Sequence, residues 1–578
     1  MSGFAEVLQK LSPEKRALLS AKLPPLSFAQ QRMWFLDLYK PDSHYYTIAT
    51  AVQLTGPLNV PALERSFTES IRRHQVLRTN FVMLGDRPVQ FVNPAARVTL
   101  PIIDLTEIPA ERQVDVAERI ATEESQRPFD LMNDKLVRLG LIRLEQDKHV
   151  LLLAMHHIIS DGWSTGLLIR EVSILYDAYS HGREPELPEL AIQYTDYAAW
   201  QREWLQGEIL EQELDYWREE LKGAPPVLEL PADRPRPALP SYRGGHYTAR
   251  LSEAVSDGLK ALGQEETVTT FMLLLAAFQV FLYRYTGQKD ICVGTPIAGR
   301  NRIESEALIG LFVNTLVIRT ELSPRQSFRE VLRVIRDKAL EAFAHQNVPF
   351  EKLVEVLQPE RSLNRTPFFQ VMFSLQNAAA AEAPQMSELK LEFWKHDKTM
   401  SQFDFMLTTV ETDRFNFTVE YSRDLFDETT VMRMLDHFRN LLEDIVRTPD
   451  QRISRLSLLK DDERRETIAQ WNQTETLYPR ESSIHALFEQ QAARTPDAVA
   501  VICGDVRLTY RELNERANQL AHHLQALGVG PDVLVGICLE RSVEMIVAAL
   551  GALKAGGAYV PLDPSYPMPR LAAMLEDS

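Results

Sequence analysis

The stretch LLLAMHHIISDGWS, residues 151–164, places side chains capable of acid–base chemistry at the end of an apolar run. His156 and His157 follow five mostly aliphatic residues, and Asp161, directly followed by Gly162, comes four residues after the second histidine. An imidazole has an intrinsic pKa of about 6.5 and can therefore accept or relay a proton near neutral pH. The pattern predicts a reactive histidine at the end of a buried strand.

The two histidines are expected to have different roles. Successive side chains of a strand point to opposite faces, so His156 and His157 do not face one cavity while the strand continues. A catalytic zinc needs three protein ligands, and this stretch offers one histidine, Asp161 and no evident third, so we expect no metal. The plain alternative is a structural pair, with both rings hydrogen-bonded inside a core. The context favours one ring facing a gap while the other is buried and fixed.

The residues after the histidines suggest how the site is held. A buried carboxylate must be paired, so Asp161 is expected to grip an arginine and support the geometry. Gly162 has no Cβ and lets backbone or substrate approach, although a turn that needs positive φ would also select glycine. Trp163 and Ser164 open a helix, whose N-terminus favours negative charge. A base in this setting can deprotonate an attacking amine or hydroxyl, which suggests acyl transfer.

Strands and helices alternate along the first 450 residues, which predicts an α/β fold. Around the histidines we expect a strand at 47–56, a helix at 60–77, two strands within 137–157 and a helix at 163–182. A second α/β block is expected to contain helices at 252–263, 268–286, 327–344 and 428–449, and strands at 290–299 and 312–322. A helix at 4–22 and a loop at 377–388 are also expected.

Composition narrows the class of protein. The chain has 578 residues, 45% hydrophobic and 25% charged, which is ordinary for a globular protein of several domains. A formal net charge of −17 argues against binding to nucleic acid or an anionic membrane. The three cysteines lack CxxC spacing, which fits a reducing cytoplasm. The longest apolar run, 271–283, is too short for a membrane helix, and no signal peptide is evident.

Several motifs in order resemble one family. MHHIISDGWS resembles the HHxxxDG motif of the condensation domains of nonribosomal peptide synthetases, which share a fold with chloramphenicol acetyltransferase. Six other stretches look like the remaining core motifs: LSFAQQRMWFLDLY (26–39), RRHQVLRTNF (72–81), YTDYAAW (194–200), IGLFVNTLVIR (309–319), HQNVPFEKLV (345–354) and LNRTPFFQVMF (363–373). Seven ordered motifs are far more specific than one.

The end of the chain resembles another domain of the same enzymes. WNQT (471–474) looks like the end of a condensation–adenylation linker, and the stretches 508–524 and 553–564 look like the first two core motifs of an adenylation domain. No SGTTGxPKG-like phosphate loop is present, so we expect no amino-acid activation by this chain. Residues 483–578 are interpreted as the N-terminal piece of a partial α/β adenylation domain.

The resemblance implies two chloramphenicol acetyltransferase-like lobes in a V, with the active site in a tunnel between them. The expected ranges are an N-terminal linker or docking helix at 1–25, an N-lobe at 26–200, a C-lobe at 201–450, a linker at 451–482 and the adenylation piece at 483–578.

The resemblance also implies a reaction. An upstream carrier protein presents an acyl or peptidyl thioester, a downstream carrier presents an aminoacyl amine, and attack by the amine forms an amide. Both substrates ride on phosphopantetheine arms, and the domain itself binds no cofactor or metal. The adjoining adenylation domain is a further expected partner, and the domain is expected to be monomeric.

Residue roles follow from the same resemblance. His157 is the catalytic or positioning residue, His156 its structural partner, and Gly162 leaves room for the acceptor arm. Asp161 is expected to pair with Arg78 or Arg300, which the sequence does not separate. Trp163 and Asn314 are expected to line the tunnel, although Asn314 fits a structural role at a strand end equally well.

Alternative functions keep the fold but change the chemistry. The SFAQQRMWFL stretch (27–36) looks like the branch that accepts an L-configured donor residue. A starter domain that takes its acyl group from an acyl-CoA or acyl carrier protein is an alternative, and so is a noncatalytic scaffold that only docks carriers. Heterocyclisation is disfavoured because His156 stands where that relative has aspartate, and epimerisation is disfavoured by the adenylation start that follows.

Overall fold

The computed structural model of the chain falls into two compact units, Met1–Arg464 and Arg465–Ser578, which are described separately. The residues described are 22–39, 43–85, 87–359, 364–377, 386, 388–394 and 400–578. The expected helix at 4–22 and most of the expected loop at 377–388 lie outside this set.

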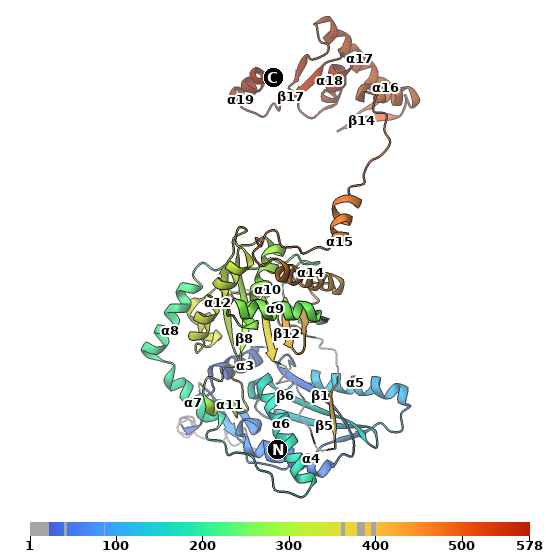
Figure 1. Ribbon diagram of the computed structural model, residues 1–578. Coiled ribbons are helices and arrows are strands. Elements are labelled where there is room, and N and C mark those ends of the chain that lie inside the picture. The colour runs from blue at the N-terminus through green and yellow to red at the C-terminus, as the bar shows by residue number, and fades with distance from the viewer. Residues whose placement is uncertain are drawn as a thin grey trace. The chain divides into compact units, whose positions relative to one another are not determined.

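The first sheet of the larger unit carries the histidine motif (Figure 1). Its strand order is β11-β1-β6-β5-β4, with β11 Lys390–Phe393, β1 Thr47–Thr55, β6 Lys148–His156, β5 Val137–Glu145 and β4 Ile102–Asp104. The helices around it are α3 Phe28–Tyr39, α4 Val60–Arg73, α5 Ala110–Gln126, α6 Gly162–Ser180 and α7 Tyr194–Trp204, with a hairpin of β2 Thr79–Leu84 and β3 Arg87–Val92. We call this part the first lobe.

The first sheet is covered on both faces because its strands are apolar at consecutive positions. Leu152 packs in a cluster with Ala117 and Ala121 of α5, whereas Leu153 packs in the cluster that contains residues of α4 and α6. Alternating side chains of one strand thus supply two separate cores. The predicted strands and helices of this region are confirmed, except that the helix predicted at 60–77 ends at Arg73 and continues as a 3-10 turn, η1 Gln75–Arg78.

The second sheet builds the second lobe. Its order is β7-β13-β12-β10-β8-β9, with β7 Gly244–Arg250, β13 Phe415–Ser422, β12 Phe405–Glu411, β10 Val371–Asn377, β8 Asp290–Ile297 and β9 Asn314–Glu321. Its helices are α8 Gly207–Glu220, α9 Glu253–Glu265, α10 Thr270–Thr286, α11 Ile303–Glu306, α12 Phe328–Ala344, α13 Phe350–Leu357 and α14 Glu428–Arg447. The helices and strands predicted for this block are present within a few residues of the expected ends.

Helix α10 is the centre of the second core. Every residue from Met272 to Leu282 is buried, which explains the long apolar run in the sequence. Among the described residues, no single helix is long and apolar enough to cross a membrane; α9 and α10 meet that requirement only together, across a bend of 109°.

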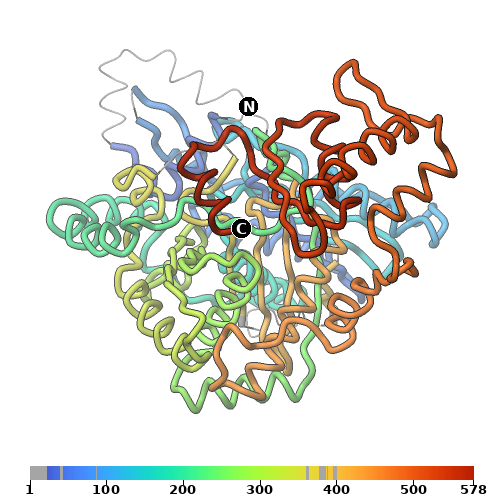
Figure 2. The backbone as a smooth tube through the Cα atoms, turned by 90° about the horizontal axis from the view of Figure 1, so that it is seen from above, coloured from blue at the N-terminus to red at the C-terminus, as the bar shows by residue number. Residues whose placement is uncertain are grey.

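Three stretches of the chain link the two lobes. Helix α7 contributes Tyr194 and Ala198 to the first core, and α8, at the periphery in Figure 2, contributes Leu214 and Trp217 to the second. The segment 298–313, which joins the neighbouring strands β8 and β9, returns to the first lobe and is here called the crossover segment. Strand β11 also returns and pairs antiparallel with β1. These two segments follow residue 200, where the lobes were expected to divide, but they belong to the first lobe.

The smaller unit is an α/β arrangement with its own small core. Its elements are α16 Ile484–Arg494, β14 Val499–Cys503, β15 Val506–Thr509, α17 Tyr510–Ala526, β16 Leu534–Ile537, α18 Val543–Lys554, β17 Ala558–Pro561 and α19 Met568–Asp577. Leu508, Leu513 and Val543 form the core. The helix, strand, helix and strand predicted after residue 508 are confirmed. The linker predicted to be irregular contains a short helix, α15 Asp461–Arg465, followed by a π-helical turn, η4 Glu466–Gln470.

Candidate active site

The strand that carries the histidines ends between them. The amide of His156 still bonds across the sheet to the carbonyl of Leu136 at 3.1 Å. His157 begins a 3-10 turn, η2 His157–Ile159, and its amide bonds to the carbonyl of Tyr46 at 2.7 Å. The two rings therefore belong to different local structures.

His156 is buried and locked. Its Nδ1 accepts a hydrogen bond from the amide of Ile158 at 3.1 Å, and its ring lies edge-on to Phe129 and Tyr46. Burial is the main cause that lowers the pKa of His156 to about 3, so the ring is neutral at physiological pH. This placement agrees with the structural role expected for His156.

His157 is neutral and available. Burial lowers its pKa below the ordinary value, and the Asp161 carboxylate and nearby backbone carbonyls oppose this shift. Nδ1 of His157 is buried and has no side-chain hydrogen-bond partner among the described residues, and the backbone carbonyls of His157 itself and of Ser160 lie near the ring. An imidazole in this state can accept a proton, whereas the Nδ1 of His156 is occupied by the amide of Ile158 and its Nε2 is buried without a partner among the described residues.

The turn η2, which begins at His157, is held by Gln30, a residue for which the sequence predicted no role. Gln30 of α3 is fully buried, and its Nε2 donates to the carbonyl of Ile158 at 3.2 Å. Its Oε1 accepts from the amide of Ser27 at 3.1 Å. Gln30 lies in the motif LSFAQQRMWFLDLY, so the motif was identified but its contact with η2 was not.

Asp161 pairs with Arg300, and the side chains are 4% and 2% exposed. Arg300 donates to Asp161 Oδ1 at 3.1 Å, and the same oxygen caps α6 by accepting from the amide of Ser164 at 2.8 Å. Oδ2 accepts from the amide of Phe312 at 3.0 Å. The carboxylate is thus satisfied on both oxygens, as a buried charge must be.

The alternative partner, Arg78, does not reach Asp161. Its guanidinium donates to the carbonyl of Asn93 and, at 3.5 Å, to the carbonyl of Arg72. It is the last residue of η1 and holds the end of the β2–β3 hairpin. The prediction of Arg78 as a partner of Asp161 is therefore wrong.

Gly162 starts α6 and does not need a left-handed backbone. Its φ is not positive, and a methyl group on its Cα would have no atom within 4 Å. The turn explanation for this glycine is wrong, and the open space agrees with the clearance explanation. Trp163 beside it is 49% exposed, and its Nε1 donates to the carbonyl of Glu306 at 3.2 Å.

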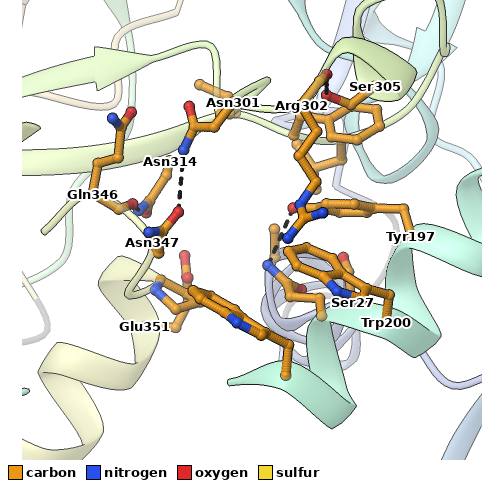
Figure 3. A pocket seen from close by; sticks show the side chains of 18 of the residues that line it. Ser27, Tyr197, Trp200, Asn301, Arg302, Ser305, Asn314, Gln346, Asn347 and Glu351 are labelled. Carbon is orange, nitrogen blue, oxygen red and sulfur yellow. Dashed lines mark hydrogen bonds between the residues drawn. The ribbon is translucent and has the colours of Figure 1, made fainter. Parts of the chain in front are cut away.

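A cavity of about 590 Å³ lies between residues of the two lobes (Figure 3). Tyr197 and Trp200 face Asn314 and Asn347 across it. His157 is not among its lining residues, so no reacting group is placed there.

Asn314 borders this cavity but is fully bonded. Its Nδ2 donates to the carbonyls of Gln346 and Val348 at 3.0 and 2.8 Å, and its Oδ1 accepts from the amides of Thr315 and Phe350, both at 2.9 Å. These bonds support the structural explanation for Asn314. No group of three metal-ligating side chains occurs among the residues that the structure describes.

Comparison with known proteins identifies the larger part of the chain. The family model described as "Condensation domain" matches residues 21–468. The chain belongs to the condensation-domain family. A model described as "AMP-binding enzyme" matches residues 488–578, which places the start of such a region after the condensation domain. Condensation domains of nonribosomal peptide synthetases catalyse amide-bond formation, and this chain has only a partial AMP-binding region.

The condensation domain has relatives in large synthetases. The chain is 41% identical over 554 residues to tyrocidine synthase 3 of Brevibacillus parabrevis, a match that covers 96% of this chain and only 8% of that protein. It is 30% identical to the X-domain from teicoplanin biosynthesis, solved in complex with OxyB, with a TM-score of 0.68 over 76% of this chain and 97% of that chain. A four-domain nonribosomal peptide synthetase bound to AMP and glycine shares the fold at 24% identity, with a TM-score of 0.80 over 96% of this chain and 42% of that chain.

Replacing Asp161 with asparagine should destabilise the condensation domain. One of its two oxygens becomes an NH₂ group that faces donors, either the amide of Phe312 or Arg300, and a buried arginine loses its counter-charge. Breaking a buried pair by neutralising one partner costs about 3–5 kcal/mol of unfolding free energy. Urea denaturation should show this loss, and an unchanged midpoint would contradict it. Asp177→Asn is the control, because Asp177 is a partly exposed aspartate on α6.

The stability of the protein should fall as the pH falls below about 6.5. His156 has a folded-state pKa of about 3, so between these values only the unfolded chain binds the proton. The slope is about 1.4 kcal/mol per pH unit for one group. His156→Asn keeps an acceptor near the position of Nδ1 without titrating, so the dependence of unfolding free energy on pH from 4 to 6 should become shallower by about one proton. An unchanged slope would show that His156 does not titrate in this way.

Proposed function

We propose that the condensation domain joins a carrier-bound acyl or peptidyl thioester to the amine of a carrier-bound aminoacyl thioester. The amine nitrogen forms a bond to the thioester carbonyl carbon, the carbon–sulfur bond breaks, and the donor arm leaves as a thiol. The amine loses one proton in the process. The product is an amide on the acceptor arm, and no oxidant, metal or diffusible cofactor takes part in this step.

The state of His157 carries this proposal. Its pKa is lowered, so the ring is neutral near pH 7, and among the described residues no other side chain hydrogen-bonds to it. It can accept the proton that the amine loses, or orient the amine through a hydrogen bond. A free α-amine has a pKa of about 7.7–8.0 and is partly neutral already, so orientation contributes to the rate along with proton transfer.

The surrounding residues act on geometry. In the proposed reaction His156 fixes the strand end, and Asp161 and Arg300 fix the start of α6. The open space at Gly162 is where we place the acceptor arm. A tunnel between two lobes arranged in a V, with Trp163 on its wall, belongs to the same proposal.

The partners and substrates follow from the relatives. We infer that donor and acceptor arrive on phosphopantetheine arms of an upstream and a downstream carrier protein, that an adenylation domain adjoins, and that the enzyme works as a monomer in the cytoplasm. All three cysteines are unpaired, in keeping with a reducing compartment. The motif at 27–36 favours an L-configured donor residue, and an acyl-CoA or acyl carrier protein is the alternative donor. A parallel assay of the two kinds of donor distinguishes elongation from a starter reaction.

A second candidate function is docking without catalysis. A protein of this fold that is 30% identical, the X-domain, is solved in complex with OxyB, so the fold supports binding of a partner protein. The neutral imidazole of His157 favours the catalytic function, because docking has no need for it. If the chain binds both carriers and forms no amide, docking becomes the better explanation.

Replacing His157 with alanine should reduce amide formation by about 10²–10⁴-fold with little change in melting temperature. In the unchanged protein, activity should fall as pH decreases through the lowered pKa of His157, and the variant should lose this limb. The assay is mass spectrometry of the acceptor carrier. His181→Ala is the matched control, since His181 is exposed at the end of α6. Near-normal turnover by a folded His157→Ala protein would contradict the assignment.

Substitution at Gly162 tests where the acceptor arm passes. Gly162→Ala should fold normally and keep partial activity, because φ is not positive and the added methyl group meets no atom within 4 Å. Gly162→Leu should remain folded and lose amide formation while still binding the donor carrier. Gly166→Leu on the same helix is the control, because Gly166 is equally open. Full activity of folded Gly162→Leu would exclude passage of the acceptor arm at this position.

A further inference from the structure

We propose that Ser164 is a positioning residue for condensation, which locks the crossover segment to the helix that follows His157. Ser164 does not touch the reacting groups in this proposal, and it acts through the segment it holds. The expected effect of Ser164 on kcat rests on the proposed amide-forming function. That Ser164 holds the crossover segment rests on the structure alone.

The backbone of the crossover segment is held at four consecutive residues, 309–312. Each of these residues bonds to a side chain of the first lobe, so the segment is fixed in one register. The bonds run from Ile309 N to His74 Nδ1 at 3.4 Å, from Gly310 N to Ser164 Oγ at 3.0 Å, from Ser164 Oγ to Gly310 O at 2.9 Å, from Tyr194 OH to Leu311 O at 2.6 Å, and from Phe312 N to Asp161 Oδ2 at 3.0 Å.

Ser164 uses all the hydrogen-bonding positions of its hydroxyl group. A hydroxyl offers one donor and two acceptor positions. The Ser164 hydroxyl donates to Gly310 O and accepts from Gly310 N and, at 2.7 Å, from Arg300. Its residue is completely buried, so water does not replace these bonds if the hydroxyl is removed. One hydroxyl therefore links α6, the backbone of Gly310 and the guanidinium that pairs with Asp161.

Close packing leaves the crossover segment no alternative position. A methyl group on Gly310 would lie 2.0 Å from the ring of Tyr194. Leu308, Ile309 and Phe312 are 1%, 1% and 3% exposed and belong to the core of the first lobe. Moving the segment away would expose these side chains and leave polar backbone groups unpaired, so the bonds and the packing enforce the same geometry.

The crossover segment connects the two lobes mechanically. Its ends continue into β8 and β9 of the second sheet, while Ser164 lies in the first turn of α6, seven residues after His157. A change at Ser164 therefore shifts the second lobe relative to the helix that follows the catalytic imidazole. If donor and acceptor arms enter between the lobes, such a shift misaligns the thioester and the amine without removing any binding contact. Misplacement of this kind lowers kcat and leaves KM nearly unchanged.

The test compares Ser164→Ala with Ser173→Ala in the full chain. Ser173 is a matched control, because it is a buried serine of the same helix whose hydroxyl, among the residues that the structure describes, bonds only to the carbonyl of Ile169, one turn before it. Hydrogen exchange of a peptide that spans 303–313 should accelerate by about tenfold in Ser164→Ala and stay unchanged in Ser173→Ala. Amide formation by Ser164→Ala should show a kcat about 10- to 100-fold lower, with KM for both carrier substrates within about twofold.

The outcomes separate this inference from the proposed function. Unchanged exchange at 303–313, or unchanged kcat in an active protein, would overturn the role of Ser164, as would a loss confined to KM. If the unsubstituted chain forms no amide, the proposed function fails, and hydrogen exchange alone still decides whether Ser164 holds the segment. Should Ser164→Ala not fold, Tyr194→Phe replaces it, since it removes the hydroxyl that bonds to the carbonyl of Leu311 and to Ser27 Oγ, and keeps the ring. Faster exchange with a reduced kcat is expected there too, and the absence of both would contradict the inference.

Discussion

The buried pair of Asp161 and Arg300 is the interaction on which the candidate site depends. An unpaired charge in a protein interior costs several kcal/mol, so neither side chain can leave without the other. The carboxylate also caps α6 and binds the backbone of Phe312, so one group fixes the start of a helix and the crossover segment that contains Arg300 and Phe312. A site built in this way is rigid where it supports the imidazole and open where Gly162 offers no side chain.

Neutrality of both histidines follows from the same burial. For His156 the consequence is a structural ring that keeps an acceptor for the amide of Ile158. For His157 the consequence is a base that is ready at physiological pH. The neighbouring carboxylate limits how far the pKa of His157 falls, and so keeps the ring basic enough to take a proton. Environment thus gives two adjacent residues of one type two different functions.

Local sequence patterns predicted the elements and much of the site. The end of β6, the start of α6 and the burial of Asp161 follow from the continuous apolar run before the histidines and from the chemistry of a buried carboxylate. The sequence could narrow the partner of Asp161 only to Arg78 or Arg300, because Arg300 is 139 residues away and only the folded crossover segment brings it near. The same reason hid the contacts of Gln30, Ser164 and Tyr194. Their motifs were identified, but the bonds they make join segments that no local pattern relates.

The two segments that return from the second lobe bear on how the protein folds during synthesis. The first core includes Leu308, Ile309 and Phe312, and the first sheet includes β11, which ends at Phe393. The first lobe therefore cannot complete its core when residues 1–204 have been synthesised. Its core is complete only after most of the second lobe has been made. The two lobes therefore form one cooperative folding unit and do not fold one after the other, because the first lobe is completed by two segments that come late in the sequence. A cut between α7 and α8 would separate two halves, and the first of them would lack both segments that close it.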